Sequence, residues 1–114
     1  YYNKALKLVS RLKNDFKNIF KDCDMIITPT VSVPPFGFNA YNNPVDMYQS
    51  DILTIPANLC GLPAISFQSG FDTEKRPIGM QLISNHLDDH QLLSLVHQFQ
   101  KNTDHHLQSP KEFE

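Results

Sequence analysis

The chain has few of the residues from which phosphate-binding loops and metal sites are built. Its 114 residues include only four glycines, at positions 37, 61, 70 and 79, so neither a Gly-x-Gly-x-x-Gly loop nor a Walker-type run exists. Two cysteines and five histidines are present, but they do not have the spacing of a zinc ligand set or of a His-Glu-x-x-His helix. These absences exclude a recognisable nucleotide loop and argue against a metal site.

Positive charge and long apolar runs are also scarce. The net charge is -2, which argues against a surface built to neutralise nucleic-acid phosphates. The basic residues crowd the first 21 positions, where Asp15 interrupts them, and a solvated helix face is favoured there over an RNA-binding face. No run approaches the roughly 20 apolar residues that span a bilayer, and the start shows no signal-peptide pattern. We therefore expect no membrane association.

Cys23 and Cys60 stand far apart and form no Cys-x-x-Cys motif. A reduced, cytoplasmic protein with both thiols as buried small apolar groups is the simplest interpretation. The composition is otherwise ordinary, with 40% hydrophobic and 19% charged residues, and indicates one globular unit with a modest core. The chain opens at Tyr1 without Met or a capping box and runs directly into a helical pattern. This favours a piece of a longer protein.

Two amphipathic helices are predicted from apolar residues at three- and four-residue steps. The first covers residues 2–22, and its apolar face is Ala5, Leu8, Val9, Leu12, Phe16, Ile19 and Phe20. The second covers residues 88–101, with Asp88 or Asp89 as its cap and a buried stripe of Leu92, Leu93, Val96 and Phe99. The polar tail from Asn102 onward is expected on the surface.

Three short strands are predicted between these helices. Residues 24–28 read as a strand buried on both faces, which ends at or before Pro29 because proline cannot donate to the ladder. Residues 64–67 and 78–83 read as two further strands, joined by a turn over residues 70–77 as a hairpin or as near neighbours. The resulting order predicts an α/β layered fold with a mixed sheet.

The segment between the first strand and the hairpin is rich in proline. Residues 29–46 are expected to form a long loop that packs through Val31, Val33, Phe36, Phe38 and Tyr41. Residues 47–60 can form a helix whose face is Met47, Ile52, Ile55 and Leu59. Pro56 predicts a kink or a break in it, and Gly61 a terminator.

Asp51 is the polar residue that stands out, because it lies in a segment expected to be mostly buried. A buried carboxylate is costly unless it is paired. One interpretation is a helix N-cap. The other is a counter-ion for a cationic ligand group, and the pattern alone favours the cap. Ser66 and Ser69 adjoin a strand end, but the Gly-x-Ser-x-Gly motif of a nucleophile is absent, so no catalytic set is complete.

Three stretches resemble the late part of amidase-signature enzymes. They are the strand followed by Thr28-Pro29-Thr30, the segment Met47–Ser66 with its Asp, apolar helix, Asn-Leu, Gly and Pro, and the Pro-x-Gly-x-Gln strand of residues 77–83. Within the family, the match is to the glutamine-hydrolysing subunits of tRNA-dependent amidotransferases, whose ending also resembles residues 103–106. The resemblance covers nearly the whole chain and implies that residues 1–114 are the C-terminal part of a single amidase domain.

The resemblance implies a substrate-binding role for Asp51, which occupies the position that holds the α-ammonium of glutamine; one carboxylate can also serve as a cap. It places the catalytic Ser, cis-Ser and Lys, and the Arg for the substrate carboxylate, outside this chain, which alone should be inactive. Cys60 stands where Ala is usual, and Phe67-Gln68-Ser69 replaces a Val-Pro-Cys-like stretch. No catalytic, cofactor-binding or metal-binding residue is assigned within the chain.

The activity implied is hydrolysis of glutamine to supply ammonia for converting Glu-tRNA(Gln) to Gln-tRNA(Gln). This is carbon–nitrogen ligation within a heterotrimeric complex, in which a partner subunit uses ATP and Mg and tRNA is reached through the complex. Two alternatives remain open. One is another small-amide amidase of the same family, although a neutral amide would leave Asp51 without a partner. The other is a non-catalytic interaction module.

Overall fold

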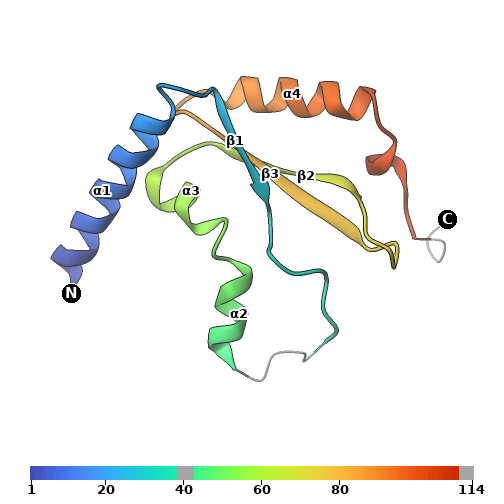
Figure 1. Ribbon diagram of the computed structural model, residues 1–114, viewed down its shortest axis with the longest axis horizontal. Helices are drawn as coiled ribbons and strands as arrows, with labels where there is room; N and C mark the ends of the chain where they lie inside the picture. The colour runs from blue at the N-terminus through green and yellow to red at the C-terminus, as the bar shows by residue number, and fades with distance from the viewer. Residues whose placement is uncertain (39–42, 111–114) are drawn as a thin grey trace.

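The computed structural model describes residues 1–38 and 43–110 (Figure 1). The chain begins with the long helix α1 (Tyr2–Ile19) and the short strand β1 (Met25–Pro29). Two short helices follow, α2 (Pro44–Ser50) and α3 (Ile55–Cys60), and then the strands β2 (Ala64–Phe71) and β3 (Pro77–Ser84). Helix α4 (Asp89–Lys101) and the 3-10 turn η1 (His105–Leu107) complete the described part.

The three strands form one sheet in the order β1-β3-β2, and both pairings are antiparallel. Strand β3 lies in the centre, with Leu82 opposite Ile27 on one side and opposite Ile65 on the other. The predicted hairpin and the α/β layered class are confirmed. A mixed sheet was expected, and the strand pairs within the described residues are all antiparallel.

The core lies between α4 and one face of the sheet. Leu82, Leu92 and Val96 are buried together, and partly buried Met25, Ile65 and Phe67 pack around them. The stripe predicted on α4 is correct for Leu92 and Val96 but wrong for Leu93, which is 63% exposed. Successive residues of a helix are rotated by about 100°, so Leu92, Val96 and Phe99 lie on one face of α4 and Leu93 points away from it. Asp88 occupies the predicted cap position without a side-chain cap bond.

Helix α1 is confirmed, although it ends at Ile19 rather than at residue 22. Its apolar face is only partly covered: Val9, Leu12 and Phe16 are half-buried, whereas Leu8 is 60% exposed. The face touches α3. Tyr1 caps the helix without a side-chain bond, as the missing capping box predicts. No helix in the described residues is long and apolar enough to cross a bilayer.

Strand β1 differs from the prediction in its burial. Ile27 is 59% exposed, so the strand is not covered on both faces. The reason is its position: within the described residues β1 pairs only with β3, while α4 packs on β2 and β3. Pro29 is the last residue of the strand, as expected. Cys23, just before the strand, is exposed rather than buried, whereas Cys60 is buried.

The long loop does not pack as expected. Val31, Val33 and Phe36 are exposed to 40%, 39% and 51%, and Phe38 is fully exposed. Tyr41 lies outside the described residues. The predicted loop range also overlaps α2, which begins at Pro44 after Asn43 accepts a hydrogen bond from the Val45 N–H at 3.0 Å.

The helix predicted over residues 47–60 is broken rather than kinked, which is one of the two outcomes expected from Pro56. Helix α2 ends at Ser50, and α3 starts anew with Pro56 in its first turn, where a missing N–H costs no hydrogen bond. Gly61 ends α3 in the left-handed conformation, with φ of 67°, as predicted. The described tail lies mostly on the surface, as expected, except that Thr103 and His105 are half-buried and the His105 ring lies 6.1 Å from that of Phe71.

The contrast between Leu92 and Leu93 can be tested directly. Leu92→Ala should lower the free energy of unfolding by roughly 2–5 kcal/mol, because it empties a filled site in the core. Leu93→Ala, one residue further on the same helix, should change it by less than about 0.5 kcal/mol. Urea unfolding of the two variants, followed by circular dichroism, measures both. Equal losses would mean that α4 does not present Leu92 to the sheet.

Candidate functional site

Asp51 lies at the C-terminal end of α2, where it is the C-cap residue. Its φ and ψ of -95° and -6° belong to the right-handed helical region. The N-cap of α3 is Thr54, which makes no side-chain cap bond. The interpretation of Asp51 as a helix N-cap is therefore wrong, because residues 51–54 separate the two helices and the carboxylate stands at the wrong end of the gap.

Residues 51–54, called here the Asp51 connector, close on the backbone of Asp51. Its carbonyl oxygen accepts from the N–H of Thr54 at 3.0 Å and of Ile55 at 3.1 Å. The Thr54 hydroxyl donates to the same oxygen at 3.0 Å. Asn58 then donates from its side chain to the Thr54 carbonyl at 3.2 Å. These bonds make a tight turn whose conformation is set by the backbone and leave the Asp51 carboxylate outside the network.

The carboxylate of Asp51 is exposed, contrary to the expectation of a mostly buried segment. The Ser50 hydroxyl approaches it at 3.5 Å, but that hydroxyl donates far more closely, at 2.6 Å, to the Met47 carbonyl. No Lys, Arg or His of the described residues forms an ion pair with Asp51. A carboxylate of this kind can accept charge-assisted hydrogen bonds from a cationic ligand group.

Gln81 fastens the Asp51 connector to the sheet. Its side chain is 3% exposed in the middle of β3, and its amide nitrogen donates to the Leu53 carbonyl at 2.7 Å and to the Thr28 hydroxyl at 3.0 Å. The sequence motif that contains Gln81 gave it no role. The available signal was a polar residue in an otherwise apolar strand, since such a group is retained in a core only when it is bonded.

A pair of hydroxyls lies beside this anchor. Thr30 and Ser66 are bonded through their side-chain oxygens at 2.8 Å, across the sheet from β2 to the residue after β1. Gly79 permits the approach, because a Cβ there would lie 3.2 Å from the Thr30 hydroxyl oxygen. A cavity of about 300 Å³ opens next to them and is also lined by Asn58 and Gln81.

Neither serine singled out from the sequence is placed as an activated nucleophile. Ser66 is engaged with Thr30, and Ser69 donates to the Ile78 carbonyl at 3.3 Å. Among the described residues neither hydroxyl is bonded to a base, which nucleophilic catalysis requires. The described residues also contain no group of three or more His, Cys, Asp or Glu side chains that could hold a metal ion.

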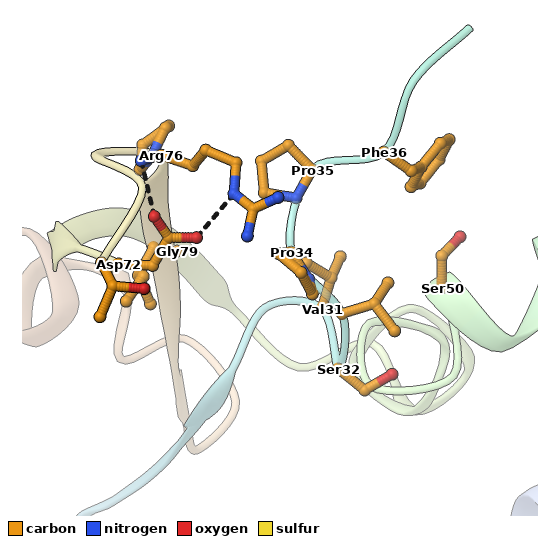
Figure 2. A pocket seen from close by; sticks show the side chains of 13 residues that line it. Val31, Ser32, Pro34, Pro35, Phe36, Ser50, Asp72, Arg76 and Gly79 are labelled. Atoms are coloured by element: carbon orange, nitrogen blue, oxygen red, sulfur yellow. Dashed lines mark hydrogen bonds and ion pairs between the residues drawn. The ribbon is translucent and has the colours of Figure 1, made fainter. Parts of the chain in front are cut away.

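A second cavity, of about 470 Å³, lies between the proline-rich loop and the end of the β2–β3 hairpin (Figure 2). Asp72 and Arg76 stand on one side and Ser50 on the other, with Val31, Pro34 and Pro35 between them. Asp51 does not line it. The cavity walls are mostly apolar side chains, so this space offers few polar contacts for a small charged substrate.

Asp72 and Arg76 are committed to the hairpin turn. Asp72 accepts the N–H of Arg76 at 2.8 Å and of Glu74 at 2.9 Å, and its other oxygen binds Arg76 Nε at 2.7 Å. Arg76 Nη1 also lies 3.2 Å from Glu74. The Arg76 backbone N–H, ahead of its guanidinium, lowers the pKa of Asp72 below its ordinary value. Arg76 is therefore engaged within its own turn.

Residues 1–93 match the family model described as Amidase, and the chain belongs to that family. Among curated relatives, the glutamyl-tRNA(Gln) amidotransferase A subunit of Psychrobacter sp. is 50% identical over 93% of this chain and 21% of its own length. The protein of the same name from Bacillus cereus is 44% identical over 93% of this chain and 22% of its own. This chain thus spans about a fifth of these relatives.

Solved structures agree with this assignment. The glutamyl-tRNA(Gln) amidotransferase A subunit from Thermotoga maritima superposes with a TM-score of 0.77 and 38% identity, over 81% of this chain and 20% of that one. The structure of 6-aminohexanoate cyclic dimer hydrolase superposes with a TM-score of 0.72 and 19% identity, over 93% of this chain and 24% of the other. The second likeness concerns the fold alone. Both likenesses support the α/β fold.

The Asp72 turn gives a pH-dependent prediction. Because the folded-state pKa of Asp72 lies below its unfolded value, its contribution to stability is present above the unfolded pKa of about 3.9. It is lost as the pH falls through the folded pKa. Asp72→Asn should therefore destabilise the protein at pH 7 and cease to do so in acid, as thermal melting over a pH series would show. A constant difference at every pH would contradict the ionised turn.

Proposed function

We propose that this chain supplies the ammonium-binding part of a glutamine pocket, in the glutaminase subunit of a glutamyl-tRNA(Gln) amidotransferase. The names of the relatives support this, since proteins 44% and 50% identical over most of the chain are the A subunits of that enzyme. Asp51 is the residue that binds substrate, through the α-ammonium of glutamine. The substrate is therefore a zwitterionic amino acid rather than a neutral amide.

The observation that supports this role is the state of the Asp51 carboxylate. It is exposed, has no ion-pair partner among the described residues, and projects from a connector that is closed by its own backbone. Binding therefore does not require an existing ion pair to break, and little conformational freedom is lost in the turn. A charge-assisted hydrogen bond to an ammonium contributes about 1.5–3 kcal/mol. That magnitude is enough to select glutamine over amides without an α-amino group.

The chemistry of amide hydrolysis is assigned to residues outside this chain. A serine attacks the amide carbon of glutamine, ammonia leaves with a proton relayed by a second serine and a lysine, and water then releases glutamate. Neither Ser66 nor Ser69 is arranged for that step, since each is bonded to a hydroxyl or a carbonyl. Arg76 is bound in its own turn, and the guanidinium for the substrate carboxylate is assigned, like the catalytic residues, to a part of the subunit outside this chain. This chain alone is inactive.

The ammonia released serves a partner subunit, which uses ATP and Mg to amidate Glu-tRNA(Gln). The chain's part in the complex is to bind glutamine, and tRNA is bound through the other subunits. The two cysteines, Cys23 and Cys60, are unpaired, which fits a reducing compartment such as the cytoplasm. The alternative of a non-catalytic interaction module has no comparable support, because nothing in the described residues indicates what kind of partner would bind.

Asp51→Asn in the complete subunit tests the proposal. The amide keeps the shape of the carboxylate but removes its charge, so the KM for glutamine should rise about 10- to 100-fold, from the lost charge-assisted bond. The value of kcat should change little, because the α-ammonium is bound equally in the ground and transition states. Steady-state glutaminase kinetics measure both constants.

Two controls separate binding from folding. Asp15→Asn removes an exposed carboxylate on α1 and should leave the KM for glutamine unchanged. Amidation driven by added ammonia bypasses glutamine, so Asp51→Asn should retain it. An unchanged KM for glutamine in Asp51→Asn would remove Asp51 from the site.

A further inference from the structure

We infer that Gln81 is a positioning residue for Asp51: its buried amide sets where the Asp51 connector sits on the sheet. This inference rests on the proposed role of Asp51 as the ligand for the α-ammonium of glutamine. The observations that carry it are the burial of Gln81, the two bonds of its amide nitrogen and the absence of any other polar link between connector and sheet in the described residues.

The position of Gln81 is costly for a polar side chain. It lies on the central strand, opposite Thr28 of β1 and Ser66 of β2, and precedes buried Leu82 and Ile83. Successive residues of a strand face opposite sides of the sheet. Leu82 packs under α4, so Gln81 faces the other side, where the connector lies. An amide buried there without hydrogen-bond partners would destabilise the fold.

The hydrogen bonds fix the orientation of the Gln81 amide. The Leu53 carbonyl can only accept, so the group that faces it at 2.7 Å must be the amide NH₂. The second proton points to the Thr28 hydroxyl at 3.0 Å. That hydroxyl approaches the Pro29 carbonyl at 3.1 Å, so it is itself held and can accept from Gln81. Both donors of the amide are therefore used, one on the sheet and one on the connector.

Leu53 lies two residues after Asp51, within the same closed turn. The Asp51 carbonyl takes three hydrogen bonds from Thr54 and Ile55, so Leu53 and Asp51 move together. No other hydrogen bond within the described residues joins residues 51–54 to a strand. Burial of Ala57 and Cys60 secures α3 further along the chain, but not the turn itself. A small displacement of a binding group far from the chemistry can have large kinetic effects.

The matched pair Gln81→Met and Thr28→Val separates the two bonds. Methionine has a similar length and no donor, so it abolishes the bond to Leu53. Thr28→Val removes only the hydroxyl that accepts on the sheet side and leaves the bond to Leu53. We expect Gln81→Met to raise the KM for glutamine about tenfold with kcat reduced less than about twofold, and Thr28→Val to change the KM less than about twofold.

A double-mutant cycle distinguishes positioning from a general structural role. If Gln81 acts through Asp51, Gln81→Met should have no further effect on KM in an Asp51→Asn background. With glutaramate, which is glutamine without its α-amino group, Gln81→Met should match the wild type. A structural defect would instead lower kcat, and it would persist in both the Asp51→Asn background and the glutaramate assay.

The outcomes are separable. If Asp51→Asn raises the KM but Gln81→Met does not, positioning by Gln81 is overturned and the glutamine-binding role stands. If Asp51→Asn does not change the KM, the proposed glutamine-binding role is overturned, and the inference about Gln81 is overturned with it. Should Gln81→Met not fold, Gln81→Asn keeps an amide that is one methylene too short to reach Leu53. It should raise the KM in the same selective way, and a KM equal to that of the wild type would overturn the inference.

Discussion

The pairing of β3 on both of its edges is the constraint through which the other described elements are placed. Its backbone bonds to β1 and β2 use both sides of the strand, and its alternating side chains divide the molecule into two layers. Leu82 faces α4 and forms the apolar core, whereas Gln81 faces the Asp51 connector and forms a polar anchor. One strand thus separates the part that stabilises the fold from the part that carries the candidate site.

The two layers differ in what they would tolerate. The α4 side depends on close packing of Leu82, Leu92 and Val96, where the cost of a change scales with the volume removed. The connector side depends on directional bonds from Gln81, where the type of atom matters more than its size. At Gly79 both volume and hydrogen bonding matter, because the absence of a side chain there leaves room for the hydrogen bond between Thr30 and Ser66. The backbone of the candidate site is thus bonded to the sheet through Leu53, whereas the Asp51 side chain stays exposed.

The sequence predicted the positions of the helices and strands better than it predicted which of their side chains are buried. Periodicity located α1, α4 and the hairpin, because each is determined by local spacing. Burial was less predictable: Ile27, Leu93 and Cys23 are exposed, since exposure depends on which neighbour covers each position. For the site, the resemblance pointed to Asp51, but its place as a C-cap depended on Pro56 starting a new helix. The role of Gln81 needed the distance to Leu53, which lies 28 positions away.

The outer edge of β1 affects how the isolated chain associates with other copies of itself. In the described residues this edge is unpaired, the strand Met25–Pro29 has no charged side chain, and Ile27 is largely exposed. Natural sheets protect such edges with charge, bulges or covering segments, and here only Pro29 interrupts the row of backbone donors. An uncovered strand of this kind is a template for edge-to-edge association between copies. The unpaired edge of β1 therefore gives copies of the isolated chain a route to associate through backbone hydrogen bonds, whatever their net charge.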